Sequence, residues 1–176
     1  MEIRRLSLQD LDPIVAIENA VYPTPWSRSM FAGELAKPSS VCLGAFELDG
    51  DAGRLSGYLI VSRYVDAWHV MNVAVEPGHR RQGIASLLLN RLFELTSGRS
   101  RRGYTLEVRV SNAGAIKLYE EVGFRPRGVR RGYYTDNRED ALIMWKDPVS
   151  ASKAPRQSDD GLASSLANIE RDHGVG

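Results

Sequence analysis

The sequence VAVEPGHRRQGIA, at residues 73–85, sets the interpretation of the whole chain. The apolar run from Met71 to Val75 predicts a strand, and the residues after Gly83 predict an amphipathic helix. Gly83 carries no Cβ that would keep a ligand away from the backbone, and the first turn of a helix has N–H groups without intrahelical partners. With Arg80 and Arg81 beside these donors, the segment predicts a site for a phosphate or pyrophosphate group.

Two common kinds of nucleotide site are not indicated. The chain has no G-x-x-x-x-G-K-[ST] run, and no G-x-G-x-x-G follows a predicted strand. The strand is followed instead by Arg-x-x-Gly-x-Ala over Arg80–Ala85, which resembles the acetyl-CoA pyrophosphate loop of the GNAT N-acetyltransferases. Taken alone, this short pattern also fits an ordinary basic turn between a strand and a helix, so the rest of the chain has to decide.

The composition fits a single soluble domain. The chain has 176 residues, 43% of them hydrophobic, which suffices for one well-filled core. A formal charge of +1 predicts no general attraction to nucleic acid or to an anionic membrane. Cys42 is the only cysteine, so an intrachain disulfide is excluded, and the first residues do not resemble a signal peptide. No apolar run approaches the length of a membrane span, and we expect a cytoplasmic protein.

The predicted elements follow one another in the order β-α-α-β-β-β-α-β-α-β-β. Apolar periodicity, capping residues and Pro or Gly breaks define them. Asp49–Gly53 predicts a hairpin turn, and Gly123 predicts a left-handed residue at the end of the last helix. The strands are expected at residues 2–6, 41–47, 55–63, 68–75, 104–110, 124–134 and 141–146, and the helices at 7–20, 27–37, 84–96 and 111–122.

This order resembles the GNAT fold over nearly all of residues 1–146. The resemblance implies a mixed α/β (α+β) architecture, in which helices flank a mostly antiparallel sheet whose two central strands splay apart. We therefore expect a GNAT acetyltransferase domain at residues 1–146. Residues 147–176 are rich in Ser, Ala, Asp and Gly, and we expect a mostly disordered tail, with a helix at Leu162–Ile169 as the alternative.

Three further segments make the resemblance narrower. Residues 22–27 read YPTPWS, residues 106–112 read LEVRVSN and precede AIKLYE at 115–120, and residues 132–134 read GYY. They are similar to segments of RimI-type enzymes, which acetylate the N-terminal alanine of a small-subunit ribosomal protein. The resemblance implies an acetyl-CoA-dependent peptide α-N-acetyltransferase. The alternatives are transfer to other protein N-termini, lysine side chains or a small amine, and an acetyl-CoA-binding regulatory module without turnover.

The resemblance also implies where acetyl-CoA binds. Pantetheine is expected along Val73–Val75, hydrogen-bonded like an added strand, with a backbone N–H near Val73 as the oxyanion donor. The pyrophosphate is expected on the loop Arg80–Ala85. Asn112 is predicted to cap a helix, and the resemblance adds a contact with acetyl-CoA. The expected acetyl-CoA-binding residues are Val73, Ala74, Val75, Arg80, Arg81, Gln82, Gly83, Ile84, Ala85, Asn112 and Tyr119.

Two side chains are expected to move protons. The resemblance assigns Glu107 as the general base, acting directly or through water, and we expect partial burial on a central strand to raise its pKa. The alternative is a structural carboxylate paired with Arg109, which shares a face with Glu107, or with another cation. Tyr119 is expected to return a proton to the CoA thiolate, and its alternative is a core aromatic of a helix.

Aromatic residues are the expected wall of the acceptor groove, because they contact a peptide at low entropic cost. The candidates are Trp26, Tyr133 and Tyr134. The alternatives are a packing role for Trp26 between the first two helices and a core position for one of the two tyrosines. An α-amine has a reference pKa of about 8, against roughly 10.4 for lysine, so a modest base favours an N-terminal acceptor. Glu18 is expected to be solvated or to attract a basic peptide.

The remaining expectations concern metals and partners. His69, His79 and His173 lack the spacing of metal ligands, so no metal site is expected. We expect a protein N-terminus as the partner, no direct contact with nucleic acid or membrane, and a monomer or weak oligomer. The arginines at residues 99–102 and 125–131 are expected to be solvated.

Overall fold

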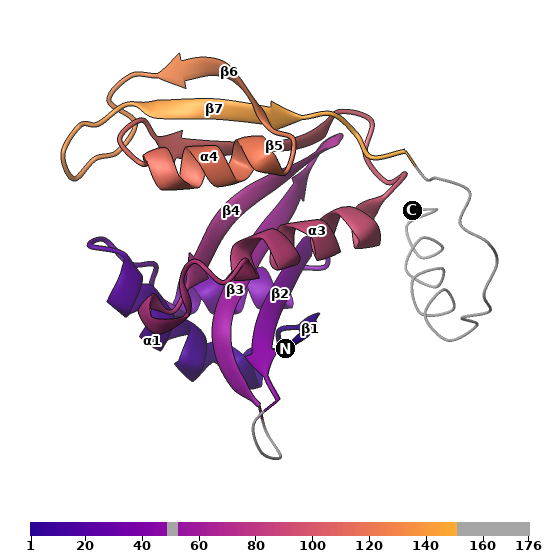
Figure 1. Ribbon diagram of the computed structural model, residues 1–176, viewed down its shortest axis with the longest axis vertical. Coiled ribbons are helices and arrows are strands. Elements are labelled where there is room, and N and C mark those ends of the chain that lie inside the picture. Colours follow the sequence, from indigo (N-terminus) through magenta and orange to yellow (C-terminus); the bar gives the residue numbers. More distant parts are fainter. Residues whose placement is uncertain (49–52, 151–176) are drawn as a thin grey trace, which may run out of the picture.

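The computed structural model describes residues 1–48 and 53–150 (Figure 1). The element order in these residues agrees with the prediction, and the boundaries agree closely except in β6. The strands are β1 (Glu2–Arg5), β2 (Ser40–Glu47), β3 (Arg54–Tyr64), β4 (Ala67–Val75), β5 (Gly103–Arg109), β6 (Arg125–Arg130) and β7 (Ala141–Lys146). The helices are α1 (Leu11–Val21), α2 (Arg28–Ala36), α3 (Ile84–Thr96) and α4 (Ala113–Glu121), with short 3-10 helices at Leu8–Asp10 and Pro77–His79.

One sheet joins the described strands in the order β1-β2-β3-β4-β5-β7-β6. Every neighbouring pair is antiparallel except β4 and β5, which are parallel. Figure 1 shows β2, β3 and β4 forming one half of the sheet, while β5, β6 and β7 turn away with α4 beside them. The sheet therefore has the mixed, mostly antiparallel architecture predicted for the GNAT fold.

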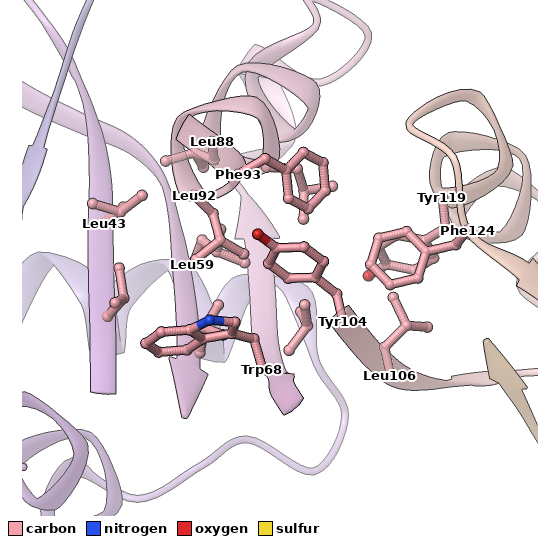
Figure 2. Packing of buried hydrophobic residues seen from close by; sticks show 14 of the residues in the cluster. Leu43, Leu59, Trp68, Leu88, Leu92, Phe93, Tyr104, Leu106, Tyr119 and Phe124 are labelled. Carbon is pink, nitrogen blue, oxygen red and sulfur yellow. The ribbon is translucent and has the colours of Figure 1, made fainter. Parts of the chain in front are cut away.

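Two apolar clusters cover opposite faces of the sheet. Alternate residues of β3 illustrate the division, because Leu59 and Val61 belong to the cluster under α3 and α4, whereas Tyr58 and Ile60 belong to the cluster under α1 and α2. In the first cluster, Phe93 packs against both Tyr104 and Phe124, and Tyr119 packs against Phe124 (Figure 2). Such two-sided burial is why the central strands have nearly continuous apolar sequences.

The predicted helix boundaries rest on local hydrogen bonds. The Ser27 hydroxyl accepts from the backbone N–H of Met30 at 3.3 Å, and the Asn112 side chain accepts from Ala115 at 3.1 Å, so both residues are N-caps. Gly123, with φ of 100°, follows the end of α4 in the left-handed region that glycine tolerates. These interactions join residues close in sequence, which is why the sequence predicts them.

Three predictions need correction or lie beyond the described residues. The strand expected to reach Tyr134 ends at Arg130, because the next residues turn toward β7 and Gly132 has φ of 57°. Most of the predicted hairpin turn at 49–53, the tail from residue 151 and its alternative helix at 162–169 lie outside the described residues. Val149 still contacts the domain, since its carbonyl accepts from Gly98 at 3.1 Å. Among the helices of the described residues, none has the length and apolarity required to cross a membrane.

Candidate active site

The two central strands separate after a short paired segment. β4 and β5 pair only at Ala67 with Gly103, Trp68 with Tyr104 and His69 with Thr105. Beyond His69, β4 continues for six residues in register with β3 alone. An irregularity in the register lies at this point, since Ile60 and Val61 of β3 face residues two apart on β4. A β-bulge bends a strand and often lies beside a functional site, and here it accompanies the separation.

The predicted pantetheine-binding residues lie in the separated part of β4. Val73 and Val75 are half-buried against the α3 and α4 cluster, and Ala74 is buried in the other cluster. Their backbone has no ladder with β5. The Tyr22 hydroxyl, from the end of α1, donates to the carbonyl oxygen of Val73 at 2.5 Å. The separated strand edge can therefore accept an extended ligand, and one of its carbonyls already has a donor from another element.

The loop before α3 has the geometry expected of an anion site. Arg80–Gly83 is exposed, and both Arg81 and Gly83 have left-handed backbone conformations, with φ of 65° and 78°. Gly83 is the N-cap of α3 but offers no side-chain cap, so the first-turn N–H groups lack the usual partner. A Cβ built at Gly83 would meet no atom within 4 Å. The loop is thus open in front of the helix N-terminus, where the dipole favours an anion.

Glu107 lies on β5, just past the last residue paired with β4. Its carboxylate is 2.5 Å from His69 Nε2 on β4, and its other oxygen is 3.6 Å from a guanidinium nitrogen of Arg130. The hydrogen bond with His69 lowers the pKa of Glu107, and this effect together with the nearby charges outweighs the rise that burial would cause. The expected raised pKa was therefore wrong, because the sequence did not reveal the His69 contact.

Arg109 is not the partner of Glu107. Its guanidinium is 2.8 Å from Asp136 and 3.1 Å from Glu139, and it stacks 3.9 Å from the ring centroid of Tyr134. The Arg109 alternative for Glu107 is therefore excluded by the geometry. Arg109, at the end of β5, instead forms ion pairs with the loop between β6 and β7.

Tyr119 of α4 is a core aromatic, as the alternative interpretation expected. Its ring packs edge-on against Phe124 with centroids 5.8 Å apart, and only 6% of the residue is exposed. Burial raises its pKa, followed by smaller effects from Tyr22 and Tyr134. The phenol therefore remains protonated at neutral pH and can donate a hydrogen bond or a proton.

The predicted acceptor-binding residues have unequal surroundings. Trp26 is half-buried and packs 5.3 Å from Phe31, which supports the packing interpretation. Tyr133 is 42% exposed, Tyr134 is half-buried, and their rings are perpendicular with centroids 5.2 Å apart. Neither tyrosine belongs to a core cluster, so the core alternative for one of them was wrong.

Glu18 of α1 is buried rather than solvated, and only 1% of it is exposed. Its carboxylate accepts from the backbone N–H of Trp26 at 2.8 Å, from the Asn72 amide at 3.2 Å and from the Tyr58 hydroxyl. These hydrogen bonds connect the loop between α1 and α2 to β3 and to the separated part of β4. The expectation that Glu18 faces solvent or a basic peptide was wrong, because its place on the inner face of α1 buries it.

The sequence interpretation did not predict the contacts of three residues in this region: His69, Tyr22 and Glu18. The spacing of Glu18 after Ile14 and Ile17 on one helical face was a signal for burial. His69 and Tyr22 gave no comparable signal, because their partners are 38 and 51 residues away in the sequence. In the described part of the chain, no group of three or more His, Cys, Asp or Glu residues has the arrangement of a metal site.

The residues of this site can hold a phosphate-bearing ligand, and a carboxylate near the separated strands can accept a proton. The open loop before α3 supplies the anion site, the separated strand supplies free backbone groups, and a carboxylate with an imidazole follows on the adjoining strand ends. Such an arrangement suits transfer of an acyl group to an amine.

Comparisons with known proteins agree with this interpretation. The model of the Acetyltransferase (GNAT) family matches residues 11–124. A [Ribosomal protein bS18]-alanine N-acetyltransferase of Escherichia coli (strain K12) is 37% identical over 144 residues, which cover 81% of this chain and 94% of that protein. The crystal structure of the ribosomal-protein-S18-alanine N-acetyltransferase from Escherichia coli superposes with a TM-score of 0.75 at 33% identity, covering 89% of this chain and 99% of that one.

A third relative carries a broader name. The N-alpha-acetyltransferase RimI of Mycobacterium tuberculosis is 35% identical over 128 residues, which cover 70% of this chain and 76% of that protein. The family match at residues 11–124 spans β4, β5, the loop before α3 and the four helices of the described residues. The chain belongs to the GNAT family of acetyltransferases.

Proposed function

We propose that this protein transfers the acetyl group of acetyl-CoA to the N-terminal α-amine of a protein, specifically the N-terminal alanine of a small-subunit ribosomal protein. The observation that carries the proposal is the separation of β4 and β5 after His69, next to the open loop at Gly83. The Escherichia coli relative is named for the same reaction on ribosomal protein bS18. The proposal extends that substrate to this chain.

The acetyl-CoA-binding residues follow from the open geometry. We propose that the backbone of Val73–Val75 holds the pantetheine arm and that the loop Arg80–Ala85 holds the pyrophosphate. The free N–H groups at the start of α3, the side chains of Arg80 and Arg81, and the absence of protein atoms in front of Gly83 support this assignment. The Asn112 amide oxygen caps α4, and within residues 1–48 and 53–150 the amide nitrogen makes no hydrogen bond, which supports its contact with acetyl-CoA. Acetyl-CoA supplies the activated acetyl group.

Glu107 and Tyr119 are the proposed proton-transfer residues. Glu107 carries a negative charge at neutral pH, since its pKa is lowered by the hydrogen bond with His69, and it therefore attracts the acceptor ammonium and its proton. Tyr119 remains protonated, since burial raises its pKa, and can donate to the departing sulfur. Removing a general acid or base of this kind typically slows a reaction by about 10²–10⁴-fold.

The acceptor is proposed to enter beside Tyr133 and Tyr134. Their ring centroids lie 5.2 Å apart in the loop that follows β6, and the last residue of β6, Arg130, is 3.6 Å from Glu107. An N-terminal α-amine has a reference pKa of about 8, so part of it is neutral at pH 7 without any enzyme. A base as modest as Glu107 then suffices, which favours a protein N-terminus over a lysine side chain. We further propose that the protein works in the cytoplasm, where ribosomal proteins are made.

Peptides that differ only in their first residue test this proposal. The purified full chain is incubated with acetyl-CoA and peptides that begin with Ala, Ser, Gly or Met, with an N-terminally blocked lysine peptide as the matched control. Mass spectrometry is expected to find the alanine peptide acetylated fastest and the blocked peptide unchanged. Mass spectrometry of ribosomal proteins from cells with and without the gene then identifies the natural acceptor. An unchanged pattern of N-terminal acetylation would reject the ribosomal substrate.

A further inference from the structure

His69 contacts Glu107, but the proton-transfer roles proposed above belong to Glu107 and Tyr119 and not to this imidazole. His69 Nε2 and Glu107 Oε2 are 2.5 Å apart, and the two side chains are 24% and 10% exposed. His69 is also the last residue of β4 that pairs with β5, and the pair lies where the strands begin to separate. The contact therefore lies at the point where β4 and β5 separate, on two strands that the sheet holds in register.

The hydrogen bond between His69 and Glu107 determines which imidazole nitrogen can accept a proton. If Nε2 donates to the carboxylate, the neutral imidazole keeps its second proton-accepting position at Nδ1. No hydrogen bond links Nδ1 of His69 to any other described residue. The lowered pKa of Glu107 keeps the carboxylate negative, and a negative partner stabilises the imidazolium that forms when Nδ1 takes a proton.

The surroundings supply little competing charge. The titratable groups that face the pair come from β3, β6 and the loop after β6, and they are Tyr64, Arg130, Tyr133 and Tyr134. Burial raises the pKa of both Tyr133 and Tyr134, so these phenols are neutral at the pH of a working enzyme. Arg130 is the one cation in this set, and at 3.6 Å and 56% exposed it is a weaker partner of Glu107 than His69 is.

We propose that His69 and Glu107 act as one proton-accepting unit, in which the carboxylate holds the imidazole and the imidazole takes the proton of the acceptor ammonium through a water molecule. This inference rests on the proposed amine acetylation and identifies the group that receives the proton. An imidazole suits the step, because its ordinary pKa of about 6.5 lies far nearer that of an α-amine than does that of a carboxylic acid.

The protons and bonds balance as follows. An N–H bond of the ammonium breaks and an N–H bond forms on His69. The amine lone pair then forms the C–N bond to the acetyl carbon while the C–S bond breaks. The second amine proton leaves as the C–N bond forms, and one proton ends on the CoA sulfur. A single proton remains on His69 and returns to water.

The first test compares rates across pH. The wild type and the His69 variant are assayed with the peptide that the wild type acetylates fastest. The result then does not depend on alanine being the natural first residue. His69→Gln keeps a partner for Glu107 but cannot accept the proton, and the expected loss in kcat at pH 7 is about 10²-fold. The loss is expected to shrink above the amine pKa of about 8, where the amine needs no base. A loss that is the same at every pH, or smaller than about threefold, would overturn the proposal.

The second test asks whether the two residues act as a unit. If they do, the double variant His69→Gln/Glu107→Gln loses about as much activity as either single variant, rather than the product of the two losses. Added imidazole is expected to restore activity to His69→Ala. His79→Gln, at saturating acetyl-CoA, is the matched control, because His79 also contacts two carboxylates, Glu47 and Glu76, away from this pair. If the losses of the two single variants multiply in the double variant, and imidazole does not restore activity to His69→Ala, the two residues do not act as a unit.

A spectroscopic test does not depend on turnover. In the wild type, ¹⁵N NMR of His69 at fixed pH is expected to show the neutral ring protonated at Nε2, because Glu107 accepts that proton. In Glu107→Gln this preference is expected to weaken. Identical tautomers in the two proteins would show that the carboxylate does not hold the imidazole, and would overturn the proposal whatever the acceptor is.

Discussion

Replacement of Gly83 tests the proposed anion site directly. Its φ of 78° lies in the left-handed region, where an L-residue costs about 1–2 kcal/mol more than glycine. Because no atom lies within 4 Å of the Cβ position, an alanine methyl group would meet no protein atom. Gly83→Ala is therefore expected to lower the free energy of unfolding by about 1–2 kcal/mol, and each kcal/mol corresponds to a fall in Tm of about 2–4 °C for a domain of this size.

The same methyl group projects into the space in front of the α3 N-terminus. If the pyrophosphate lies there, isothermal titration calorimetry is expected to show a Kd for acetyl-CoA at least about tenfold higher, a loss of about 1.4 kcal/mol. Gly83→Asn separates the two effects, because asparagine tolerates the left-handed region better than alanine but still fills the space. We expect Gly83→Asn to keep most of the stability and to lose as much affinity as Gly83→Ala, or more.

Gly78→Ala is the matched control. Gly78 also has open space at its Cβ position, but its backbone is outside the left-handed region, so its replacement is expected to change neither Tm nor Kd appreciably. Equal affinity of Gly83→Ala and Gly78→Ala for acetyl-CoA would refute the reasoning about the loop. Equal stability of the two would refute the reasoning about backbone strain.

Three further predictions concern stability and the acceptor groove. Tyr22→Phe removes the donor to the Val73 carbonyl, and we expect kcat/KM for the peptide to fall about tenfold while Tm falls by less than about 4 °C, measured by steady-state kinetics and calorimetry. Burial raises the pKa of Asp10, but hydrogen bonds from an arginine and a serine outweigh it and the net shift is downward. The ionised Asp10 carboxylate therefore stabilises the folded state above the unfolded pKa of about 3.9, and this stabilisation is lost as the pH falls through the folded pKa. Asp10→Asn is expected to have a lower Tm than the wild type at pH 7, and this difference should disappear in acid. Phe31 is fully buried, and Phe31→Ala is expected to cost about 3–5 kcal/mol in denaturant unfolding, whereas Met30→Ala at a 48% exposed position should cost under about 0.5 kcal/mol.

Local interactions explain which parts of the fold could be predicted from the sequence. Ser27 and Asn112 accept hydrogen bonds from N–H groups three residues later, and Gly123 ends α4 through its own backbone freedom. Interactions of this kind depend on a few neighbouring residues. They therefore appear in the sequence as capping and turn patterns, and they predicted the helix starts closely. The strand expected at 124–134 exists as β6, but its predicted C-terminal end was wrong, because that end depends on where β7 pairs with it.

The candidate site was predictable only in part. The loop Arg80–Ala85 is continuous in the sequence, so its basic and glycine residues indicated an anion site before any fold was considered. Glu107 was selected, but Arg109 is not its partner and the expected direction of its pKa shift was wrong, whereas the alternative of a contact with another cation agrees with Arg130 at 3.6 Å. Arg109 contacts Asp136 and Glu139, and Glu107 contacts His69, because the packing of separate strands and loops decides these pairs.

The sequence by itself determined the element order, the helix caps and the basic glycine loop, since each depends on residues close together in the chain. Only the tertiary structure decided that β4 and β5 part after His69, that His69 meets Glu107, and that Tyr22 reaches Val73. The physical reason is that a parallel pair of strands brings together residues separated by a whole helix and its loops. Local periodicity does not specify which side chains then come into contact.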